Sequence, residues 1–294
     1  MKRWFLLIAT NFLVLLMLGM VLTIAHTVFG FRFDAGVSPL LWAALFGFGG
    51  AFVSLALSKP IAKWTTGARV IATPSNDQER WLVATIARQA QAVGLRTPEV
   101  AIYPGQEVNA FATGPTRHRS LVAVSQGLLN GMSRREAEAV LAHEVSHVAN
   151  GDMVTMTLLQ GTLNTFVLLA ARAVGLVVDK AVFRNEGGAG VGYFMGNIAA
   201  QLVFGLLASL VAMAFSRQRE FRADAGGARL AGRAEMIAAL RRLQAHASAQ
   251  DREHELPRGL QAFGINGNFR SLFSSHPPLA MRIQALEQDG TFTP

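Results

Sequence analysis

The sequence predicts a mainly α-helical integral membrane protein that carries an α+β domain outside the lipid. Hydrophobic residues make up 51% of the 294 residues, a share that argues for lipid contact along part of the chain. Four apolar runs each come close to the roughly 20 residues that a helix needs to cross hydrocarbon. Between the second and third runs, a polar stretch combines helical periodicity with short β-prone segments.

The four apolar runs are predicted to form about four membrane-embedded helices. They cover residues 5–25, 39–57, 153–171 and 191–215. The first run exceeds the apolar region of a secretory signal, so an uncleaved anchor is favoured over a signal peptide. The third run contains Gln160 and Asn164. This helix therefore either spans the bilayer or lies against protein or at the interface.

Basic residues flank the apolar runs, and their distribution predicts the orientation. The formal net charge is +8, but the basic residues form no single stripe, so no nucleic-acid partner is expected. Lys2 and Arg3 precede the first run, and Lys59, Lys63 and Arg69 follow the second. The positive-inside rule places the N-terminus and the polar segments in the cytoplasm, with these side chains as membrane-flanking anchors.

The chain is expected to alternate between membrane and aqueous segments. Residues 1–58 would form an N-terminal transmembrane hairpin, and residues 153–215 a second membrane-embedded hairpin. Residues 59–152 and 216–294 would form the two parts of one aqueous domain. In its first part, a helix is predicted from Asp77 to Val93, and a small sheet from strands at residues 99–103, 109–113 and 120–125.

A helix that opens with the capping-box residues Ser133 and Glu136 carries a metal-binding pattern. It contains His143, Glu144 and His147 in the HExxH spacing. Residues four apart share a helix face, so both imidazoles can bind one Zn²⁺ while the glutamate reaches the metal-bound water. The chain has no cysteine, so the metal must use His, Asp or Glu. The alternatives are a chance match and two surface histidines, but an Ala/Val/Leu face indicates a partly buried helix.

Glu220 is the predicted third ligand. Catalytic zinc has three protein ligands and one open position, and Met153 occupies the place where an extended motif would have a third histidine. Asp224, one helical turn after Glu220, could accept the free ring N–H of a ligating histidine. The alternative is a charged helix surface on which both acids pair with neighbouring arginines.

These residues resemble those of the HtpX family, bacterial heat-shock-type membrane zinc metallopeptidases related to the eukaryotic prenyl-protein proteases. The resemblance extends over almost the whole chain and rests on an ordered set of motifs: residues 109–114, residues 143–152, residues 219–224, and His276-Pro277-Pro278 followed by Arg282. It implies a zincin-like α+β catalytic domain and one Zn²⁺ per chain. The implied ligands are His143, His147 and Glu220, and the implied catalytic base is Glu144.

The resemblance also implies a function and a location. The implied activity is zinc-dependent endopeptidase cleavage of misfolded or damaged membrane proteins, as part of quality control and the stress response. The implied place is the cytoplasmic side of the bacterial inner membrane, where the partners would be unfolded or damaged membrane-protein substrates, the lipid bilayer and possible quality-control proteins.

Two further groups gain an expected role from the resemblance. The strand of Asn109, Ala110, Phe111 and Ala112 resembles the family's edge strand, which would bind an extended substrate through its main chain; the alternative is an ordinary core strand. His276 could stabilise the tetrahedral oxyanion, with the substrate-binding residue Arg282 nearby. The alternative for His276 is a plain loop residue before Pro-Pro.

The sequence favours a membrane zinc protease with its site at the membrane surface over three other classes of protein. An intramembrane protease would carry HExxH within a span, but Arg134 and Arg135 precede the motif closely. A chaperone or adaptor with structural zinc needs a fourth ligand, and none is evident nearby. A transporter would have more ionisable residues in its spans than Arg172. The predicted reaction is peptide hydrolysis, with zinc polarising the carbonyl and Glu144 moving a proton from water to the leaving amine.

Overall fold

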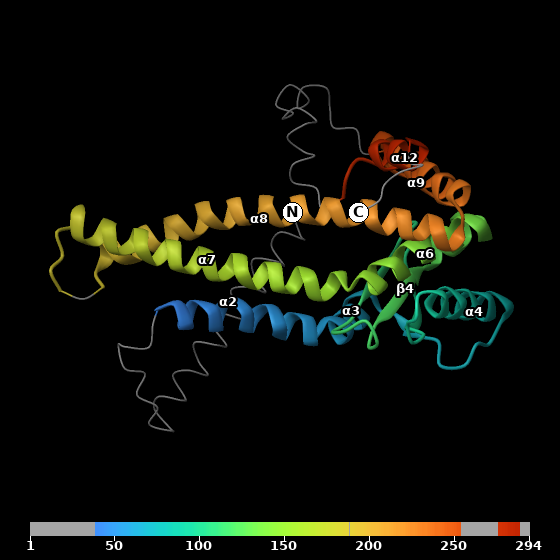
Figure 1. Cartoon of the computed structure of the whole chain (residues 1–294), viewed down its shortest axis with the longest axis horizontal. Coiled ribbons are helices and arrows are strands. Elements are labelled where there is room, and N and C mark those ends of the chain that lie inside the picture. Colours follow the sequence, from blue (N-terminus) through green and yellow to red (C-terminus); the bar gives the residue numbers. More distant parts are fainter. Residues whose placement is uncertain (1–38, 188, 254–275, 289–294) are drawn as a thin grey trace. The chain divides into compact units, whose positions relative to one another are not determined.

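The computed structural model describes residues 39–187, 189–253 and 276–288 (Figure 1). The chain forms two compact units. One contains the described residues up to Ser54 together with Met156–Ala212, and the other contains Leu55–Thr155 and the described residues from Met213 onward.

The first unit consists of helices with apolar surfaces. Its helices are α2 (Pro39–Ala56), most of α7 (Asp152–Ala181) and the first half of α8 (Val191–Ala231). Within it, α7 lies beside both α2 and α8 (Figure 1). Glycines permit this close packing, since a Cβ atom on Gly161 would lie 2.3 Å from the ring of Phe48, and one on Gly196 would lie 2.9 Å from Val178. Small residues at helix contacts are typical of membrane helices.

Among the described residues, two helices are long and apolar enough to cross a membrane, namely Asp152–Ala181 and Val191–Ala231. The bent pair Trp42–Ala56 and Ser58–Thr66 adds a third if the pair forms one span. The predicted run at residues 5–25 lies outside the described residues. The helices extend beyond the predicted runs because hydropathy marks the apolar part of a helix and not the residue where it ends.

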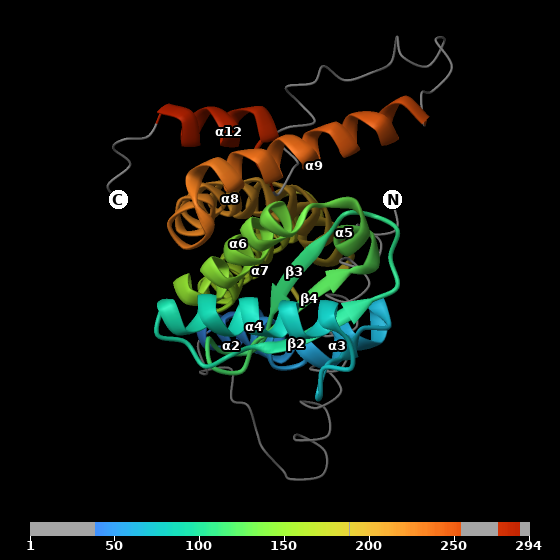
Figure 2. The same cartoon turned by 90° about the vertical axis from the view of Figure 1, so that its right-hand side faces the viewer.

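The second unit contains a small mixed sheet (Figure 2). Its strands are β1 (Arg69–Val70), β2 (Glu99–Tyr103), β3 (Ala110–Thr113) and β4 (Leu121–Ser125). The order is β1-β2-β4-β3, with β2 parallel to β4 and both outer strands antiparallel to their neighbours. The three predicted strands are confirmed, and β3 is an edge strand and not a core strand. The sequence does not predict β1, because two residues are too few to show an alternating pattern of apolar and polar residues.

Two helices cover one face of this sheet. They are α4 (Asp77–Ala92) and α6 (Arg134–Asn150). Leu82 and Ile86 of α4 and Leu141 and Val145 of α6 pack in one cluster with Val100, Val122 and Val124 of the strands. The helix predicted at residues 77–93 is confirmed, and the N-cap side chain of Asn76 accepts a hydrogen bond from Glu79 N.

Helix α6 begins and ends where the sequence predicts. Ser133 Oγ accepts from Glu136 N at 3.3 Å, and Glu136 Oε2 accepts from Ser133 N at 2.8 Å. Gly151 ends the helix with a φ of 69°, a left-handed conformation that favours glycine. Helix α7 starts at the next residue, so the chain changes direction directly after the HExxH helix.

The C-terminal part of the chain packs against the other side of α6. Helices α5 (Gln126–Gly131), α9 (Arg233–Glu253) and α12 (Leu279–Gln288) contribute to a second cluster. Met236 and Leu240 of α9 contact Ile283 and Leu286 of α12, together with Val140 of α6. This cluster fixes α12, whose first turn carries Arg282, next to the end of α8 (Figure 2).

Lys59 and Lys63, which the sequence predicts as membrane-flanking residues, also bind a carboxylate of the sheet. Both lie on α3 (Ser58–Thr66), and both donate to the carboxylate of Glu99 in β2, Lys63 at 2.7 Å. Burial alone raises the pKa of Glu99, but the two ammonium groups outweigh it and hold that pKa below its ordinary value. The lysines therefore attach α3 to the sheet.

Candidate metal centre

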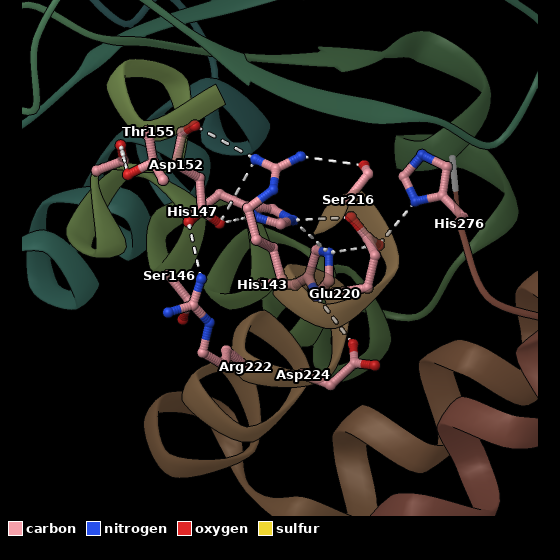
Figure 3. Close-up of polar contacts among 12 residues, drawn as sticks. His143, Ser146, His147, Asp152, Thr155, Ser216, Glu220, Arg222, Asp224 and His276 are labelled. Atoms are coloured by element: carbon pink, nitrogen blue, oxygen red, sulfur yellow. Dashed lines mark hydrogen bonds and ion pairs between the residues drawn. The ribbon is translucent and has the colours of Figure 1, made fainter. Parts of the chain in front are cut away.

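Three side chains from two helices converge in the second unit. His143 and His147 belong to α6, and Glu220 belongs to α8 after its apolar part. The two Nε2 atoms are 3.1 Å apart. Glu220 Oε2 is 3.6 Å from His143 Nε2, and Glu220 Oε1 is 3.4 Å from His147 Nε2. One ligand atom from each residue lies within 4.8 Å of the other two, so the three groups could hold a metal ion (Figure 3).

The donor set fits a catalytic metal ion. Two imidazoles and one carboxylate form a common set of catalytic zinc ligands, which leaves a further position open. Glu220 is only 2% exposed, and burial alone raises its pKa. Hydrogen bonds with His143, His147 and His276 have the opposite effect, and the pKa lies well below its usual range. The buried carboxylate is therefore charged and suited to a cation.

Each imidazole also has a carboxylate at its other ring nitrogen. His143 Nδ1 lies 2.9 Å from Asp224 Oδ1, and His147 Nδ1 lies 2.6 Å from Asp152 Oδ2. Burial lowers the pKa of His147, but the hydrogen bonds with Asp152 and Glu220 dominate and raise it to about 9. With a proton held at each Nδ1, a bound metal ion would take the place of the Nε2 proton and receive the Nε2 lone pair of each ring.

Asp152 is the residue that the sequence analysis missed. It is 2% exposed and is surrounded by basic groups, because Arg219 Nη1 donates to its carbonyl at 3.3 Å and Arg222 Nη2 lies 3.8 Å from its Oδ1 (Figure 3). Its spacing of five residues from His147 does not place it on the same face of a helix. Only the turn at Gly151 brings the carboxylate back to the imidazole. The feature of the sequence that could have indicated this contact is an acidic residue directly after the glycine that ends the helix.

Arg282, a predicted substrate-binding residue, lines the cavity described below and also binds carboxylates. It is 6% exposed, and its Nε and Nη2 atoms donate to Asp224 at 2.7 and 2.5 Å. Its Nη1 atom lies 3.3 Å from Glu220 Oε2. The side chain therefore fixes the carboxylate that contacts His143. In contrast, the side chain of His276 is 62% exposed, and its Nδ1 lies 2.7 Å from Glu220 Oε2.

A cavity of about 160 Å³ opens beside the three ligands. Glu144, His276 and Arg282 line it together with the ligands His143 and Glu220. Further lining comes from Asn109 and Ala110 next to or in β3, and from apolar side chains that include Leu128, Val140, Met236 and Leu240. Of the predicted strand residues, Phe111 and Ala112 do not line the cavity, and the Phe111 ring packs 5.6 Å from that of Tyr103.

The ligands converge because α8 passes very close to α6. A Cβ atom on Gly226 would lie 2.5 Å from Ser146 Oγ and 2.8 Å from Ser146 Cβ. A Cβ atom on Gly227 would lie 3.2 Å from the backbone nitrogen of His143. Any larger residue at the first position must push the helices apart, and Glu220 would move with its helix.

We expect Gly226→Ala to weaken zinc binding and to lower thermal stability, because the added methyl overpacks the α6–α8 contact at a typical cost of ~1–3 kcal/mol. The matched control is Gly205→Ala in the same helix, since a Cβ there meets nothing within 4 Å. Zinc titration and thermal unfolding in detergent measure both effects. Unchanged zinc affinity in Gly226→Ala would contradict the role of this contact.

We expect Asp152→Asn to reduce zinc affinity by roughly 10–100-fold, the usual effect of losing a carboxylate that orients a ligating histidine. Asp77→Asn is the control, because Asp77 is also the first residue of a helix but has an 87% exposed side chain. Competition with a chelator measures the affinity. Equal affinities for the two variants would show that Asp152 supports only the start of α7.

The comparisons with known proteins agree with this geometry. Residues 76–289 match the model of Peptidase family M48. The chain is 54% identical to "Protease HtpX" of Alkalilimnicola ehrlichii, covering 98% of each chain, and 54% identical to "Protease HtpX" of Xanthomonas axonopodis pv. citri, covering 97% of each. "Protease HtpX homolog" of Nitrosomonas eutropha is also 54% identical, over 98% of this chain and 99% of that protein.

A solved structure shares the fold. The crystal structure of S. mikatae Ste24p aligns with a TM-score of 0.63 at 20% identity, covering 97% of this chain, which spans 66% of that chain. Together with a matched family model over most of the chain, these relatives confirm the resemblance seen in the sequence. The chain is a membrane protein that belongs to Peptidase family M48, and it is a metalloprotease.

Proposed function

We propose that this protein is a membrane-bound zinc endopeptidase that cleaves misfolded or damaged membrane proteins on the cytoplasmic side of the inner membrane. The observation that carries the proposal is the convergence of His143, His147 and Glu220 beside a cavity that also contains Glu144. One Zn²⁺ per chain is the proposed ion, since this donor set is that of catalytic zinc sites.

Glu144 is the proposed general base. Zinc, when bound, would polarise the peptide carbonyl and acidify a water molecule. Glu144 is adjacent to the proposed ligand His143 in the sequence and lines the same cavity as Glu220, which supports its role beside that water. It would accept the proton from the water and deliver it to the amine that leaves.

His276 and Arg282 are proposed to have different roles. His276 has an exposed side chain at the cavity wall, so its imidazole can reach a substrate and stabilise the developing oxyanion. Arg282 is bound on two atoms by Asp224. Its proposed role is to orient that carboxylate and, through it, the ring of His143.

The free edge of β3 is the proposed substrate-binding strand. In the described part of the chain β3 pairs with β4 alone, and Asn109 faces β4, since its carbonyl accepts from Ser125 N at 2.9 Å. Because main-chain groups alternate along an antiparallel strand, Ala110 and Ala112 direct theirs to the free edge. An extended substrate paired there would lead directly into the cavity, and main-chain pairing tolerates many sequences.

The substrate class and the location rest on three kinds of support. A strand edge binds segments that are extended, which favours unfolded chains over folded ones. The relatives are named Protease HtpX, which supports proteolysis, and the quality-control role with its partners in the same membrane is what the resemblance to that family implies. Basic residues around the apolar runs support a cytoplasmic site, with residues 59–152 and 216–294 as the catalytic domain.

We expect Glu144→Gln to keep its zinc but to lose about 10²–10⁴-fold in peptidase activity, since the amide cannot accept the proton. The control is Glu138→Gln in the same helix, a residue that pairs with Arg88 at the surface. Digestion of an unfolded protein by purified, zinc-loaded enzyme in detergent measures the effect. Retained cleavage by Glu144→Gln would overturn the assignment of the base.

We expect Ala112→Pro to raise KM for an unfolded substrate with little change in kcat or zinc content. Proline removes the outward N–H that would pair with substrate, and an edge position can tolerate it. Ala112→Ser keeps the N–H and serves as the matched control. If both variants had the KM of the parent protein, β3 would not be the substrate-binding edge.

A further inference from the structure

Helix α3 has an inverted arrangement of polar and apolar residues. In a water-soluble protein, a surface helix normally directs its apolar side to the core and its charges to solvent. In α3, Ile61 and Trp64 are 45% and 85% exposed, and Leu57, which precedes the helix, is 48% exposed. Their spacing of four and three residues places them on one side of the helix. No residue of α3 is buried within the described part of the chain.

The charged residues of α3 point the other way. Lys59 and Lys63 both bind the carboxylate of Glu99, with side chains that are 16% and 34% exposed. These ammonium groups are therefore paired within the second unit and are not presented to an external anion. Any surface that covers the outer side of α3 must be recognised through apolar contact and not through charge.

The position of α3 along the chain indicates what that surface is. One residue, Leu57, separates α3 from the end of α2, and α2 exposes Leu45, Phe52 and Val53, as a lipid-facing helix does. The exposed apolar side chains thus continue from a membrane helix into α3 without interruption in the sequence. A tryptophan with an exposed ring at this place is typical of the bilayer interface, where an amphipathic ring contacts both hydrocarbon and headgroups.

We propose that α3 lies in the interface of the bilayer, with Leu57, Ile61 and Trp64 in the boundary between headgroups and acyl chains. The two lysines and Glu99 attach the helix to β2, and α3 also packs near β3. The sheet is thereby held at the membrane surface. On the proposed function, the free edge of β3 is then close to segments that leave the bilayer.

Spin labels test the position of α3 directly. The chain has no cysteine, so Ile61→Cys gives a single labelling site in otherwise unchanged protein, and Gln91→Cys on the exposed end of α4 is the matched control. In phosphatidylcholine vesicles, the label at residue 61 should collide more often with oxygen than with a water-soluble nickel complex. The ratio of the two collision rates should correspond to a shallow depth in the bilayer. The control label should show the reverse.

Two outcomes would overturn the proposal. A label at residue 61 that is as accessible to the nickel complex as the control would show that α3 faces water or a protein partner. A label deep in the hydrocarbon would show that α3 continues the span of α2. Trp64 fluorescence gives an independent measurement, with Trp4, Trp42 and Trp81 replaced by Phe. Lipids brominated near the headgroup should quench it most, and added salt should not change the quenching.

A functional measurement separates this proposal from the proposed activity. The double substitution Ile61→Ser and Trp64→Ser should reduce cleavage of a membrane-embedded substrate in vesicles while leaving cleavage of an unfolded soluble protein in detergent unchanged. If the variant cleaved each substrate as fast as the parent protein does, the functional part of the proposal would be wrong. Loss of detergent cleavage as well would point to damage of the fold and would also count against it.

Discussion

The close contact between α6 and α8 is the constraint on which the rest of the site depends. Gly226 lies against Ser146, and Gly227 lies against the backbone of His143. With no side chain at these two positions, the helices approach closely enough for Glu220 to reach both imidazoles. Two residues four apart on one helix can supply two ligands, but the third ligand requires a second helix at backbone contact distance.

Carboxylates then fix the direction of each ligand. Asp224 and Asp152 contact the Nδ1 atoms of His143 and His147, so the Nε2 atoms face one another and the carboxylate of Glu220. Buried acids are costly unless they are paired, and here Arg282 binds Asp224 while arginines of α8 surround Asp152. Arg219 and Arg222 thus stabilise Asp152, and Arg282 stabilises Asp224, the two acids that contact the candidate metal ligands.

The same unit combines a polar site with an apolar outer helix. The sheet presents one edge strand next to the cavity, and it is bound through Glu99 to a helix whose apolar side chains face outward. Both features fit the proposed function, in which the substrates are membrane proteins. In that proposal an extended chain would pair with β3 through its main chain, and α3 would contact lipid without needing a charged headgroup.

The sequence alone determined the elements whose signals are local. The capping box at Ser133, the glycine stop at Gly151 and the β-prone residues of β2 and β4 depend on neighbours within a few residues, and the HExxH spacing depends on one helix. The third ligand was inferred from the need for a third donor and from the resemblance. Only the tertiary structure showed the contacts between segments. Asp152 contacts His147, Arg282 binds Asp224, and Lys59 and Lys63 bind Glu99. It also showed that β3 lies at the edge of the described sheet. These contacts depend on how the chain packs across long sequence separations, and no periodicity or local spacing encodes them.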